Sequence, residues 1–409
     1  VKAILTVPDL APSKIDIDKL ALQWIENKTE YPEPSTFIHD RLSSFSYSNG
    51  NGILAKDVVL YGFGRIGRLA ARRIIAQTGK GEQLRLKAIV IRAKMKDAPS
   101  ELEKRAALLR TDSIHGDFRG TVIVDASKNQ IIANGNRIQV IFANDPGEID
   151  YTRYGIKNAL LIDNTGVWRD REGLSKHLRP GIAKVLLTAP GKDVPNVVHG
   201  INQTEFDPNS ENIFSAASCT TNAISPIIFL INQTFGIEKG HVETIHAYTS
   251  DQNLLDNFHK KPRRGRGAAV NMVLTSTGAA SAVAKVIPEM SGKLTGNAVR
   301  VPTPNVSLAI LNLSLQKPTS IAEVNEVFKN AALQGDLVEQ IHYSTDTEYV
   351  SSNAVGMTST SVIDAPSTLV SNDGKNITVY AWYDNEFGYT CQLVRFAKYI
   401  AGVRRKCYY

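Results

Sequence analysis

The chain has 409 residues and a mass of 44.8 kDa, more than one hydrophobic core usually supports, so we expect two domains and an additional segment. Its 43% hydrophobic and 21% charged residues are typical of a folded globular protein and exclude a chain that is disordered throughout. The net charge of +7 is a mild excess, which suits an anionic small substrate as well as nucleic acid. No apolar run is long enough to cross a membrane, so we expect no membrane partner.

The chain contains three cysteines, Cys219, Cys391 and Cys407, and none of them belongs to a CxxC pair. This pattern argues against a disulfide framework and a cysteine-based zinc site, so we expect no metal. It predicts a protein of a reducing compartment, which we take to be the cytoplasm. The first residue is Val1 rather than Met, so we expect the natural start to lie upstream, and a removed targeting segment stays an open alternative.

Residues 1–56 differ from the rest of the chain and form a predicted arm. Proline-bearing stretches flank one predicted helix, over 15–28, in which Leu20 and Ile25 share a face. Residues 43–52 are rich in Ser, Asn and Gly and are predicted to be a linker. The arm either docks on a partner or neighbouring subunit, or is an addition packed on the surface, and the sequence does not decide between the two.

From residue 57 the pattern becomes strand, helix, strand, which predicts an open parallel sheet with helices on its faces. The expected strands are 58–60, 84–91, 159–162, 185–187 and 213–214. The last three each end in small or polar residues, including Thr165 and Thr188. Ligands of parallel sheets bind at such carboxyl ends, so we expect one long crevice there and cofactor contacts from these two threonines.

A glycine-rich turn, Gly62-Phe63-Gly64-Arg65-Ile66-Gly67, follows the first strand and precedes a helix. The first glycine permits a tight turn, the second lets the backbone approach a pyrophosphate, and the third permits close packing of helix on strand. The helix N-terminus then faces the phosphates. In this context the motif predicts a dinucleotide-binding site that includes Arg65 and Ile66.

The end of the second strand bears on the choice of cofactor. An acidic residue there usually accepts hydrogen bonds from the ribose 2′-hydroxyl of NAD. No acid occurs over 84–96, where Arg92, Lys94 and Lys96 stand instead. Because an arginine can bind a phosphate with two hydrogen bonds, we expect NADP to be accepted or preferred, with Arg92 at the 2′ position. The alternative is that Arg92 points to solvent and that NAD binds without it.

After Cys219 the strands become longer and alternate in polarity, which predicts a mixed or largely antiparallel sheet. The expected strands are 242–246, 300–301, 306–316 and 379–383. A final helix is predicted over 388–405. The fold class is therefore α/β, with a dinucleotide-binding domain and an α+β catalytic domain.

Cys219 lies at a strand end and opens a predicted helix that runs to about residue 235. The helix dipole there lowers the pKa of a thiol and favours a nucleophilic thiolate. His246 ends another predicted strand, and a Cys–His pair implies covalent catalysis with the imidazole as base and acid. A buried inert cysteine and a structural histidine are the alternatives.

A basic cluster over 260–266 places five cations in seven residues. Nucleic-acid contact is one interpretation. No aromatic residues are interleaved for stacking on bases, so a loop that binds a phosphorylated substrate or a neighbouring subunit is favoured.

Six segments along the chain resemble one known family, the phosphorylating glyceraldehyde-3-phosphate dehydrogenases of bacterial type. They are 61–68, 215–222, 276–280, 292–296, 301–306 and 382–386. The resemblance runs from about residue 57 to about residue 403 and does not include the arm. It implies a Rossmann-type NAD(P)-binding domain over 57–218, completed by a C-terminal helix over 388–409, and a catalytic domain over 219–387.

The resemblance also implies roles for individual residues. Cys219 would be the nucleophile and His246 the general base. The ligands of the substrate phosphate would be Thr249, Arg264 and Arg300. The inorganic-phosphate site would be formed by Ser218, Thr220, Thr277 and Gly278. Asn385 would hold the nicotinamide carboxamide, and residues 248–273 would reach a neighbouring subunit in a homotetramer.

The implied reaction is the oxidative phosphorylation of D-glyceraldehyde 3-phosphate to 1,3-bisphosphoglycerate with NAD or NADP, in the glycolytic or the gluconeogenic direction. An erythrose-4-phosphate dehydrogenase, in which hydrolysis replaces phosphate attack, is the alternative, and Thr277 and Gly278 favour the first reaction. Tyr61 stands where this family usually has Asn, and Asn144 with Asp145 where many members have Arg-Asp. Both departures concern the adenosine side of the site.

Overall fold

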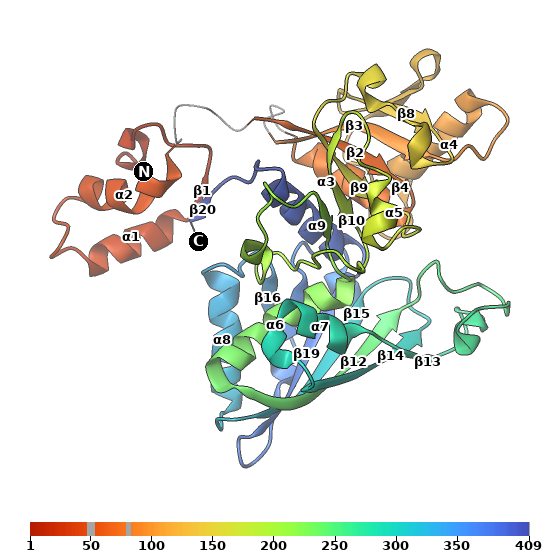
Figure 1. Cartoon of the computed structure of the whole chain (residues 1–409). Helices are drawn as coiled ribbons and strands as arrows, with labels where there is room; N and C mark the ends of the chain where they lie inside the picture. Colours follow the sequence, from red (N-terminus) through yellow and green to blue (C-terminus); the bar gives the residue numbers. More distant parts are fainter. Residues whose placement is uncertain (47–53, 79–82, 409) are drawn as a thin grey trace.

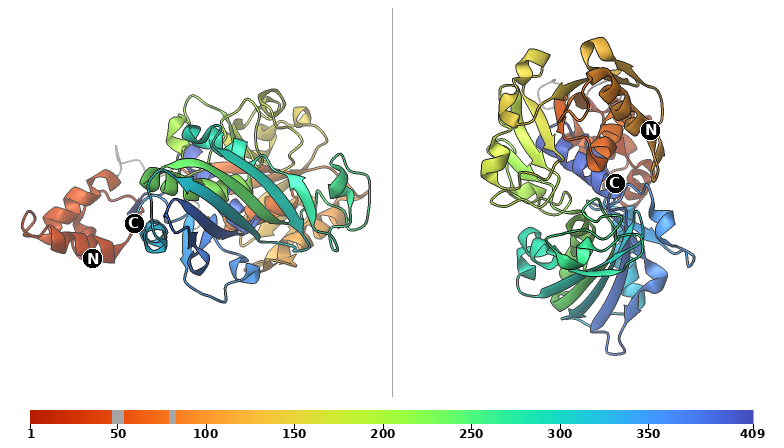
Figure 2. Two further views of the ribbon diagram at one scale, coloured as in Figure 1. Left: turned by 90° about the horizontal axis from the view of Figure 1, so that it is seen from below. Right: turned by 90° about the vertical axis from the view of Figure 1, so that its right-hand side faces the viewer.

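The computed structural model describes residues 1–46, 54–78 and 83–408, which form two sheet-based domains and a small helical module (Figure 1). The first domain, which contains the parallel sheet, lies above the second domain in this view, and the helical module projects to one side. Figure 2 shows the same projection from below. The N-terminus lies in the module, and the C-terminal segment runs back to it.

The first domain is built on a sheet whose strands, in the described residues, have the order β11-β10-β9-β2-β3-β8-β7-β6. Their bounds are β2 (Lys56–Tyr61), β3 (Leu84–Ile91), β6 (Val122–Asp125), β7 (Gln130–Ala133), β8 (Asn136–Phe142), β9 (Ala159–Asp163), β10 (Ile182–Leu187) and β11 (Ile213–Ser215). From β11 to β8 all neighbours are parallel, and β7 and β6 are antiparallel additions. All five predicted strands of this sheet are present, whereas the sequence interpretation missed the edge formed by β6, β7 and β8.

The sheet is covered on both faces, which explains the continuous apolar character of β2. Val58 and Leu60 belong to the core shared with α3 (Arg65–Ala76), α4 (Ala98–Arg110) and α9 (Phe387–Ile400). Val59 and Tyr61 point the other way, into the core shared with α5 (Arg171–Ser175). Alternate side chains of a strand face opposite sides, so each of these residues is buried. A two-stranded ribbon, β4 (Thr111–Asp112) and β5 (Gly116–Asp117), follows α4.

The second domain contains a mixed sheet with the order β13-β14-β12-β15-β19-β17-β16 and with β18 on β19. The bounds are β12 (Ile237–Ala247), β13 (Val273–Ser276), β14 (Leu294–Val301), β15 (Ser307–Leu315), β16 (Ile341–Ser344), β17 (Ser361–Asp364), β18 (Leu369–Val370) and β19 (Asn376–Tyr383). Two of its pairings are parallel, β12 with β14 and β16 with β17, and the others are antiparallel. This confirms the predicted fold class. The helices of the domain are α6 (Cys219–Phe235), α7 (Ala279–Val286) and α8 (Ile321–Leu333).

The C-terminal helix is shorter than predicted. It ends at Ile400, and the chain continues to β20 (Cys407–Tyr408), which pairs in parallel with β1 (Lys14–Ile15) of the module. The predicted helix is therefore present and packs on the first domain, but its predicted ends, at 405 and at 409, are wrong. Gly402 adopts a positive φ of 68° just after the helix, a common way to end one.

The helical module comprises 1–46 and has its own small core. Its helices are α1 (Ile17–Glu26) and α2 (Pro34–Leu42), and they pack around Leu20, Phe37 and Leu42. Helix α2 was missed because its proline suggested a loop, yet proline suits the first helical turn, where its missing N–H costs nothing. The predicted shared face is also partly wrong, because Ile25 is exposed. The predicted linker falls largely on 47–53, outside the described residues.

None of the helices in the described residues is both long and apolar enough to span a membrane. Within the same residues, no group of three or more His, Cys, Asp or Glu side chains is placed to hold a metal ion.

Candidate active site

Cys219 begins α6 directly after a tight turn that leaves the parallel sheet at β11. Ala217, in that turn, has a φ of 54°, a left-handed conformation uncommon for alanine. The Oγ atom of Ser218 caps the helix by accepting a hydrogen bond of 3.0 Å from the N–H of Thr221. These two features fix the direction in which the Cys219 thiol points.

The thiol faces His246, which lies at the end of β12 in the second domain. The Cys219 Sγ and His246 Nε2 atoms are 3.7 Å apart. They lie in the wall of a cavity of about 350 Å³. The cavity also contains most of the polar residues expected at this site: Ser218, Thr220, Arg264, Thr277, Gly278 and Arg300. Residues separated by about 80 positions in sequence thus line one cavity.

The protonation state of His246 follows from its second nitrogen. Nδ1 lies 2.7 Å from the carbonyl oxygen of Ala247, which can only accept, and 3.1 Å from the Arg300 guanidinium, which can only donate. We assign the proton to Nδ1 on the shorter of these two contacts. Nε2 then presents its lone pair to the thiol. Burial and the charge of Arg300 lower the pKa of His246 to about 3, so the imidazole is neutral near pH 7.

Desolvation raises the pKa of the Cys219 thiol, while the positive charge of Arg300 acts in the opposite direction. The sequence predicted a lowered thiol pKa from the helix dipole alone. The prediction overlooked the apolar packing around α6, whose first turn is buried from Thr220 onward. In the free protein the pair is therefore a thiol beside a neutral imidazole.

Two arginines give the cavity its positive charge. Arg300, at the end of β14, donates a hydrogen bond of 2.9 Å to the Ala247 oxygen and one of 3.4 Å to the Thr249 hydroxyl. Arg264 forms an ion pair of 2.7 Å with Asp251 and donates to the Thr275 hydroxyl at 3.0 Å. Thr249 is not among the residues that line the cavity and is connected to the site by its hydrogen bond with Arg300. Two partly buried guanidinium groups, one from β14 and one from the segment after β12, thus lie at the cavity.

Several hydroxyl groups also lie at the cavity or directly behind it. The Thr220 hydroxyl is 3.1 Å from that of Tyr383, which is also 2.7 Å from the Thr244 hydroxyl. Thr277 accepts a hydrogen bond of 3.2 Å from the N–H of Ala279 at the start of α7. The sequence interpretation assigned no site role to Tyr383 or Thr244, because nothing local distinguishes a buried strand tyrosine from a core residue. Lys285 of α7 also lines the cavity and was missed.

The glycine-rich turn has the geometry that a dinucleotide requires. A Cβ atom on Gly67 would lie 2.3 Å from the Gly62 carbonyl oxygen, so only glycine permits this packing of α3 on β2. Gly62 itself has a φ of 94°. Around Gly64 there is no atom within 4 Å of such a Cβ, and no side chain caps α3. The N–H groups of the first turn, including that of Ile66, therefore face open space and fit a pyrophosphate.

The predicted threonines lie at adjacent strand ends beside this turn. The Thr165 N–H and hydroxyl both donate to an Asp163 carboxylate oxygen at 2.7 Å. Thr188 donates to the Asp163 main-chain oxygen at 3.0 Å. Asn385 lies in the loop after β19, where its side-chain oxygen accepts from the Ser307 hydroxyl at 3.0 Å. That bond fixes the orientation of the Asn385 amide.

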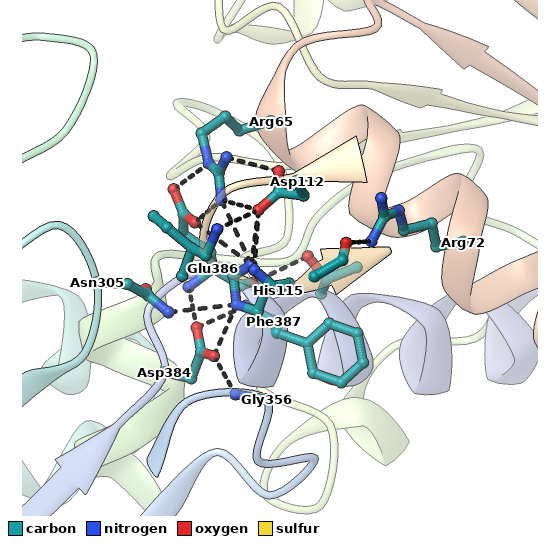
Figure 3. Close-up of polar contacts among 12 residues, drawn as sticks. Arg65, Arg72, Asp112, His115, Asn305, Gly356, Asp384, Glu386 and Phe387 are labelled. Atoms are coloured by element: carbon teal, nitrogen blue, oxygen red, sulfur yellow. Dashed lines mark hydrogen bonds and ion pairs between the residues drawn. The ribbon is translucent and has the colours of Figure 1, made fainter. Parts of the chain in front are cut away.

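A polar network joins the glycine-rich turn to the loop that carries Asn385 (Figure 3). The Arg65 guanidinium donates to Asp112 at 2.7 Å and to Glu386 at 2.7 Å. Within the same cluster, the Nε2 atom of His115 lies 2.9 Å from an Asp384 carboxylate oxygen. These ion pairs are partly buried and connect two domains through residues on either side of Asn385. The side chain of Arg65, predicted to contact the cofactor, is thus engaged in this network.

Arg92 is exposed just beyond β3, at the edge of the dinucleotide site. The sequence correctly indicated that no acid lies within 84–96. However, the buried carboxylate of Glu101, from α4, reaches this loop and accepts hydrogen bonds from the N–H groups of Lys94 and Met95 at 2.7 and 2.9 Å. Arg105 pairs with the same carboxylate at 2.6 Å. The carboxylate of Glu101 is therefore close to the loop, but its oxygens already accept hydrogen bonds from the loop and from Arg105.

The first domain has a glycine-rich turn suited to a dinucleotide, and Cys219 follows its sheet and lines a cationic cavity against the second domain. This arrangement is that of a nicotinamide-dependent dehydrogenase. Two family profiles match the chain: "Glyceraldehyde 3-phosphate dehydrogenase, NAD binding domain" over 56–171 and "Glyceraldehyde 3-phosphate dehydrogenase, C-terminal domain" over 218–385. The chain belongs to the glyceraldehyde 3-phosphate dehydrogenase family. The first 55 residues lie outside both matches.

Similar proteins agree with this assignment. The chain is 57% identical over 357 residues to a "Glyceraldehyde-3-phosphate dehydrogenase-like protein" of Pseudomonas aeruginosa, a match that covers 87% of this chain and 76% of the relative. It is 39% identical over 349 residues to the glyceraldehyde-3-phosphate dehydrogenase of Priestia megaterium, covering 85% of this chain and 99% of the relative. The corresponding enzyme of Geobacillus stearothermophilus is 40% identical over 349 residues, with the same coverage. The resemblance noted in the sequence is confirmed, as is an oxidoreductase that uses a nicotinamide dinucleotide.

Proposed function

We propose that this protein converts D-glyceraldehyde 3-phosphate, inorganic phosphate and NAD or NADP into 1,3-bisphosphoglycerate, through a thioester on Cys219. The observation that carries the proposal is the 3.7 Å approach of Cys219 to His246 in a cavity that also holds two arginines. A nucleophile, a base and anion ligands are the groups that a phosphorylated aldehyde requires.

The first step is addition of the Cys219 sulfur to the aldehyde carbon. His246 assists because its unprotonated Nε2 faces the sulfur and is neutral near pH 7. The oxygen of the adduct gains charge, and the backbone N–H of Cys219 is in the first turn of α6, where no intrahelical acceptor exists. That N–H can therefore stabilise the developing oxyanion. Loss of a hydride from the adduct carbon, for which the nicotinamide would be the acceptor, then leaves the thioester on Cys219.

The substrate phosphate and the inorganic phosphate are proposed to bind at different residues. Arg264 and Arg300, with Thr249, are proposed to hold the substrate phosphate. Ser218, Thr220, Thr277 and Gly278 are proposed to hold the inorganic phosphate, whose oxygen then attacks the thioester carbon and displaces the Cys219 sulfur. An acyl phosphate leaves, and the sulfur is regenerated.

The cofactor is proposed to lie along the carboxyl edge of the parallel sheet, and its nicotinamide supplies the hydride acceptor. Backbone N–H groups at Gly64, Arg65 and Ile66 suit the pyrophosphate, since α3 has no side-chain cap. Asn385 is fixed by Ser307 and is proposed to hold the carboxamide. Arg92 is proposed to favour NADP, because its exposed guanidinium lies just beyond β3, at the carboxyl edge of the sheet.

A homotetramer is proposed, in which the segment over 248–273 contacts a neighbouring subunit. Five of its side chains support this, because they are apolar and strongly exposed in the single chain: Leu254, Leu255, Phe258, Val270 and Met272. The basic cluster over 260–266 lies within this segment. It is proposed to support the subunit contact and not to bind nucleic acid, since Arg264 and Arg266 form ion pairs with Asp251 and Asp256. Mass measurement of the native protein in solution tests the tetramer.

The experiment that tests the reaction is an assay with and without phosphate. Formation of reduced cofactor from D-glyceraldehyde 3-phosphate should require inorganic phosphate for turnover and yield an acyl phosphate. Full turnover without phosphate, with erythrose 4-phosphate preferred, would replace this proposal by the hydrolytic reaction.

A further inference from the structure

His115 lies in the turn between β4 and β5, and its ring is at the centre of the polar network that connects the two domains (Figure 3). The side chain is 5% exposed, and its ring packs against that of Phe387 at a centroid distance of 5.7 Å. Nε2 lies 2.9 Å from an Asp384 carboxylate oxygen, and Nδ1 lies 3.3 Å from the Arg65 guanidinium. His115 does not line the Cys219 cavity, so its effect on a reaction there must pass through its neighbours.

The contact with Asp384 indicates which ring nitrogen carries a proton. The Asp384 carboxylate can only accept, whereas the Asn305 amide nitrogen, 3.2 Å from the same Nε2, can only donate. We assign the proton to Nε2 on the shorter of these two contacts. His115 therefore donates to Asp384, and its Nδ1 can accept from Arg65.

The Asp384 carboxylate also shapes the loop that carries Asn385. One of its oxygens accepts from the N–H groups of Glu386 and Phe387 at 3.0 and 2.8 Å. The other oxygen accepts from the N–H of Gly356 at 2.8 Å. The first two bonds close a turn around Asn385, so the direction of the Asn385 side chain depends on where this carboxylate lies.

His115 in turn holds the carboxylate in place. The Asp384 side chain is 0% exposed, and burial of an ionised carboxylate is costly without hydrogen-bond donors. Burial acts to raise the pKa of Asp384, but hydrogen bonds, that of His115 first among them, hold this pKa below its ordinary value. In the described part of the chain, His115 is the one side chain that hydrogen-bonds to this carboxylate. Without it, main-chain donors alone would fix the position of Asp384.

We propose that His115 is a positioning residue for hydride transfer, which acts through Asp384 on Asn385 and thereby on the orientation of the nicotinamide ring. This inference rests on the proposed function, which assigns the carboxamide to Asn385. The pyrophosphate contacts proposed at the start of α3 do not require His115, because Arg65 keeps its ion pair with Asp112. Loss of His115 should therefore lower kcat far more than cofactor affinity, since a displacement of about 1 Å can cost about 10²-fold in rate.

Two substitutions separate the roles of the two ring nitrogens. His115→Gln can place its amide nitrogen near the position of Nε2 and keep a donor toward Asp384, whereas the shorter His115→Asn reaches only the position of Nδ1. In His115→Asn we expect kcat to fall about 10- to 100-fold and KM for the dinucleotide to rise at most about fivefold. In His115→Gln we expect both constants to stay within about threefold of the native values. His342→Asn, at an exposed histidine of β16 outside the network, is the matched control and should change neither constant.

A double-variant cycle tests whether His115 acts through Asn385. In the background of Asn385→Ala, His115→Asn should lower kcat by less than about twofold, because the loop no longer has a carboxamide ligand to position. Asp384→Asn breaks the same contact from its other end, since its amide would place a donor against a donor, and should give a similar loss of kcat. Thermal unfolding shows which variants are folded, and Asp384→Asn takes the place of His115→Asn in the cycle where the latter is not.

Binding of NAD and of ADP-ribose gives a measurement that does not depend on turnover, because ADP-ribose lacks only the nicotinamide. In His115→Asn the affinity for NAD should fall about 2- to 5-fold, and that for ADP-ribose should stay unchanged. A native protein that binds NAD but oxidises neither glyceraldehyde 3-phosphate nor erythrose 4-phosphate would refute the proposed function, and this comparison would still decide the role of His115. Equal losses of affinity for NAD and ADP-ribose, a loss of kcat in His115→Gln as large as in His115→Asn, or additive losses with Asn385→Ala would each overturn the inference.

Discussion

Helices α3 and α6 both begin where a parallel strand ends, yet their first turns are built for different tasks. In α3 the preceding residue is Gly64, which provides no cap, so the helix N–H groups remain available to an external anion. In α6 the Ser218 side chain occupies one of those N–H groups, and the first helical residue is the reactive Cys219. The start of α3 is thus suited to cofactor binding and the start of α6 to covalent chemistry. Substitutions can test the two helix starts independently.

The largest expected effect comes from Cys219→Ser. A serine hydroxyl is a much poorer nucleophile than a thiolate, so acyl transfer should be abolished, while nucleotide binding at α3 should persist. Steady-state assays and cofactor titration by fluorescence measure the two properties. Activity within about tenfold of the native protein would show that Cys219 is not the nucleophile.

His246→Asn should leave a slow enzyme instead of an inactive one. The neutral Nε2 that faces the sulfur would be lost, and loss of a general base typically costs about 10²–10⁴ in rate. Cofactor affinity should again be unchanged, because α3 is untouched. A change in cofactor affinity with an unchanged kcat would contradict the assignment.

The pH dependence of kcat/KM tests the protonation state of Cys219 at the start of α6. The pKa of the Cys219 thiol is raised by desolvation, while that of His246 is lowered to about 3. The thiolate therefore forms only as the pH rises, and kcat/KM for the aldehyde should increase about tenfold per pH unit below the thiol pKa. The imidazole is already neutral over that range and adds no second inflection. A flat profile between about pH 6 and about pH 9 would show instead that the neutral thiol reacts and that His246 removes its proton during the addition.

Two alanine substitutions in the glycine-rich turn should separate binding from stability. Gly64→Ala adds a methyl group into open space, so the fold should be kept while cofactor affinity falls. Gly67→Ala forces a contact of 2.3 Å with a main-chain oxygen and should cost about 1–3 kcal/mol of unfolding free energy. Thermal unfolding and cofactor titration distinguish them. Equal stability losses in both variants would disprove this division.

The smallest effect is expected from Arg92→Ala. If Arg92 binds a 2′-phosphate, the ratio of kcat/KM for NADP to that for NAD should fall several-fold, about the value of one exposed charge-assisted contact. Lys96→Ala, a nearby exposed cation, is the control. A strong preference for NAD that is unchanged in Arg92→Ala would show that this residue does not read the 2′ position.

Most of the framework could be predicted because its signals are local. The turn over 62–67 and the polar ends of β9 and β10 each lie within a few residues, so periodicity and composition identified them. Cys219 was recognisable for the same reason. The closeness of Cys219 to His246 needed the resemblance to a family, since 27 positions separate them.

The features that were missed depend on contacts between distant segments. Tyr383 bridges two hydroxyls that lie 163 and 139 positions away, and its own sequence context is that of an ordinary strand. His115 meets Asp384 across 269 positions. The carboxylate of Glu101 reaches the loop after β3 from a helix, which no pattern within the strand could indicate. The short strands β1 and β20 carry no periodicity at all.

The pairing of β1 with β20 also has a consequence for how the chain is made. The core of the arm includes Tyr408, which packs edge-on against Phe45 with ring centroids 6.1 Å apart. Tyr408 also bonds to Gln23, which lies 385 positions earlier. During synthesis the arm emerges before Tyr408, so its core stays incomplete until the segment that carries β20 has left the ribosome. Products that end before β20 therefore lack the aromatic ring that packs on Phe45, and their arm exposes apolar surface that the longer chain covers.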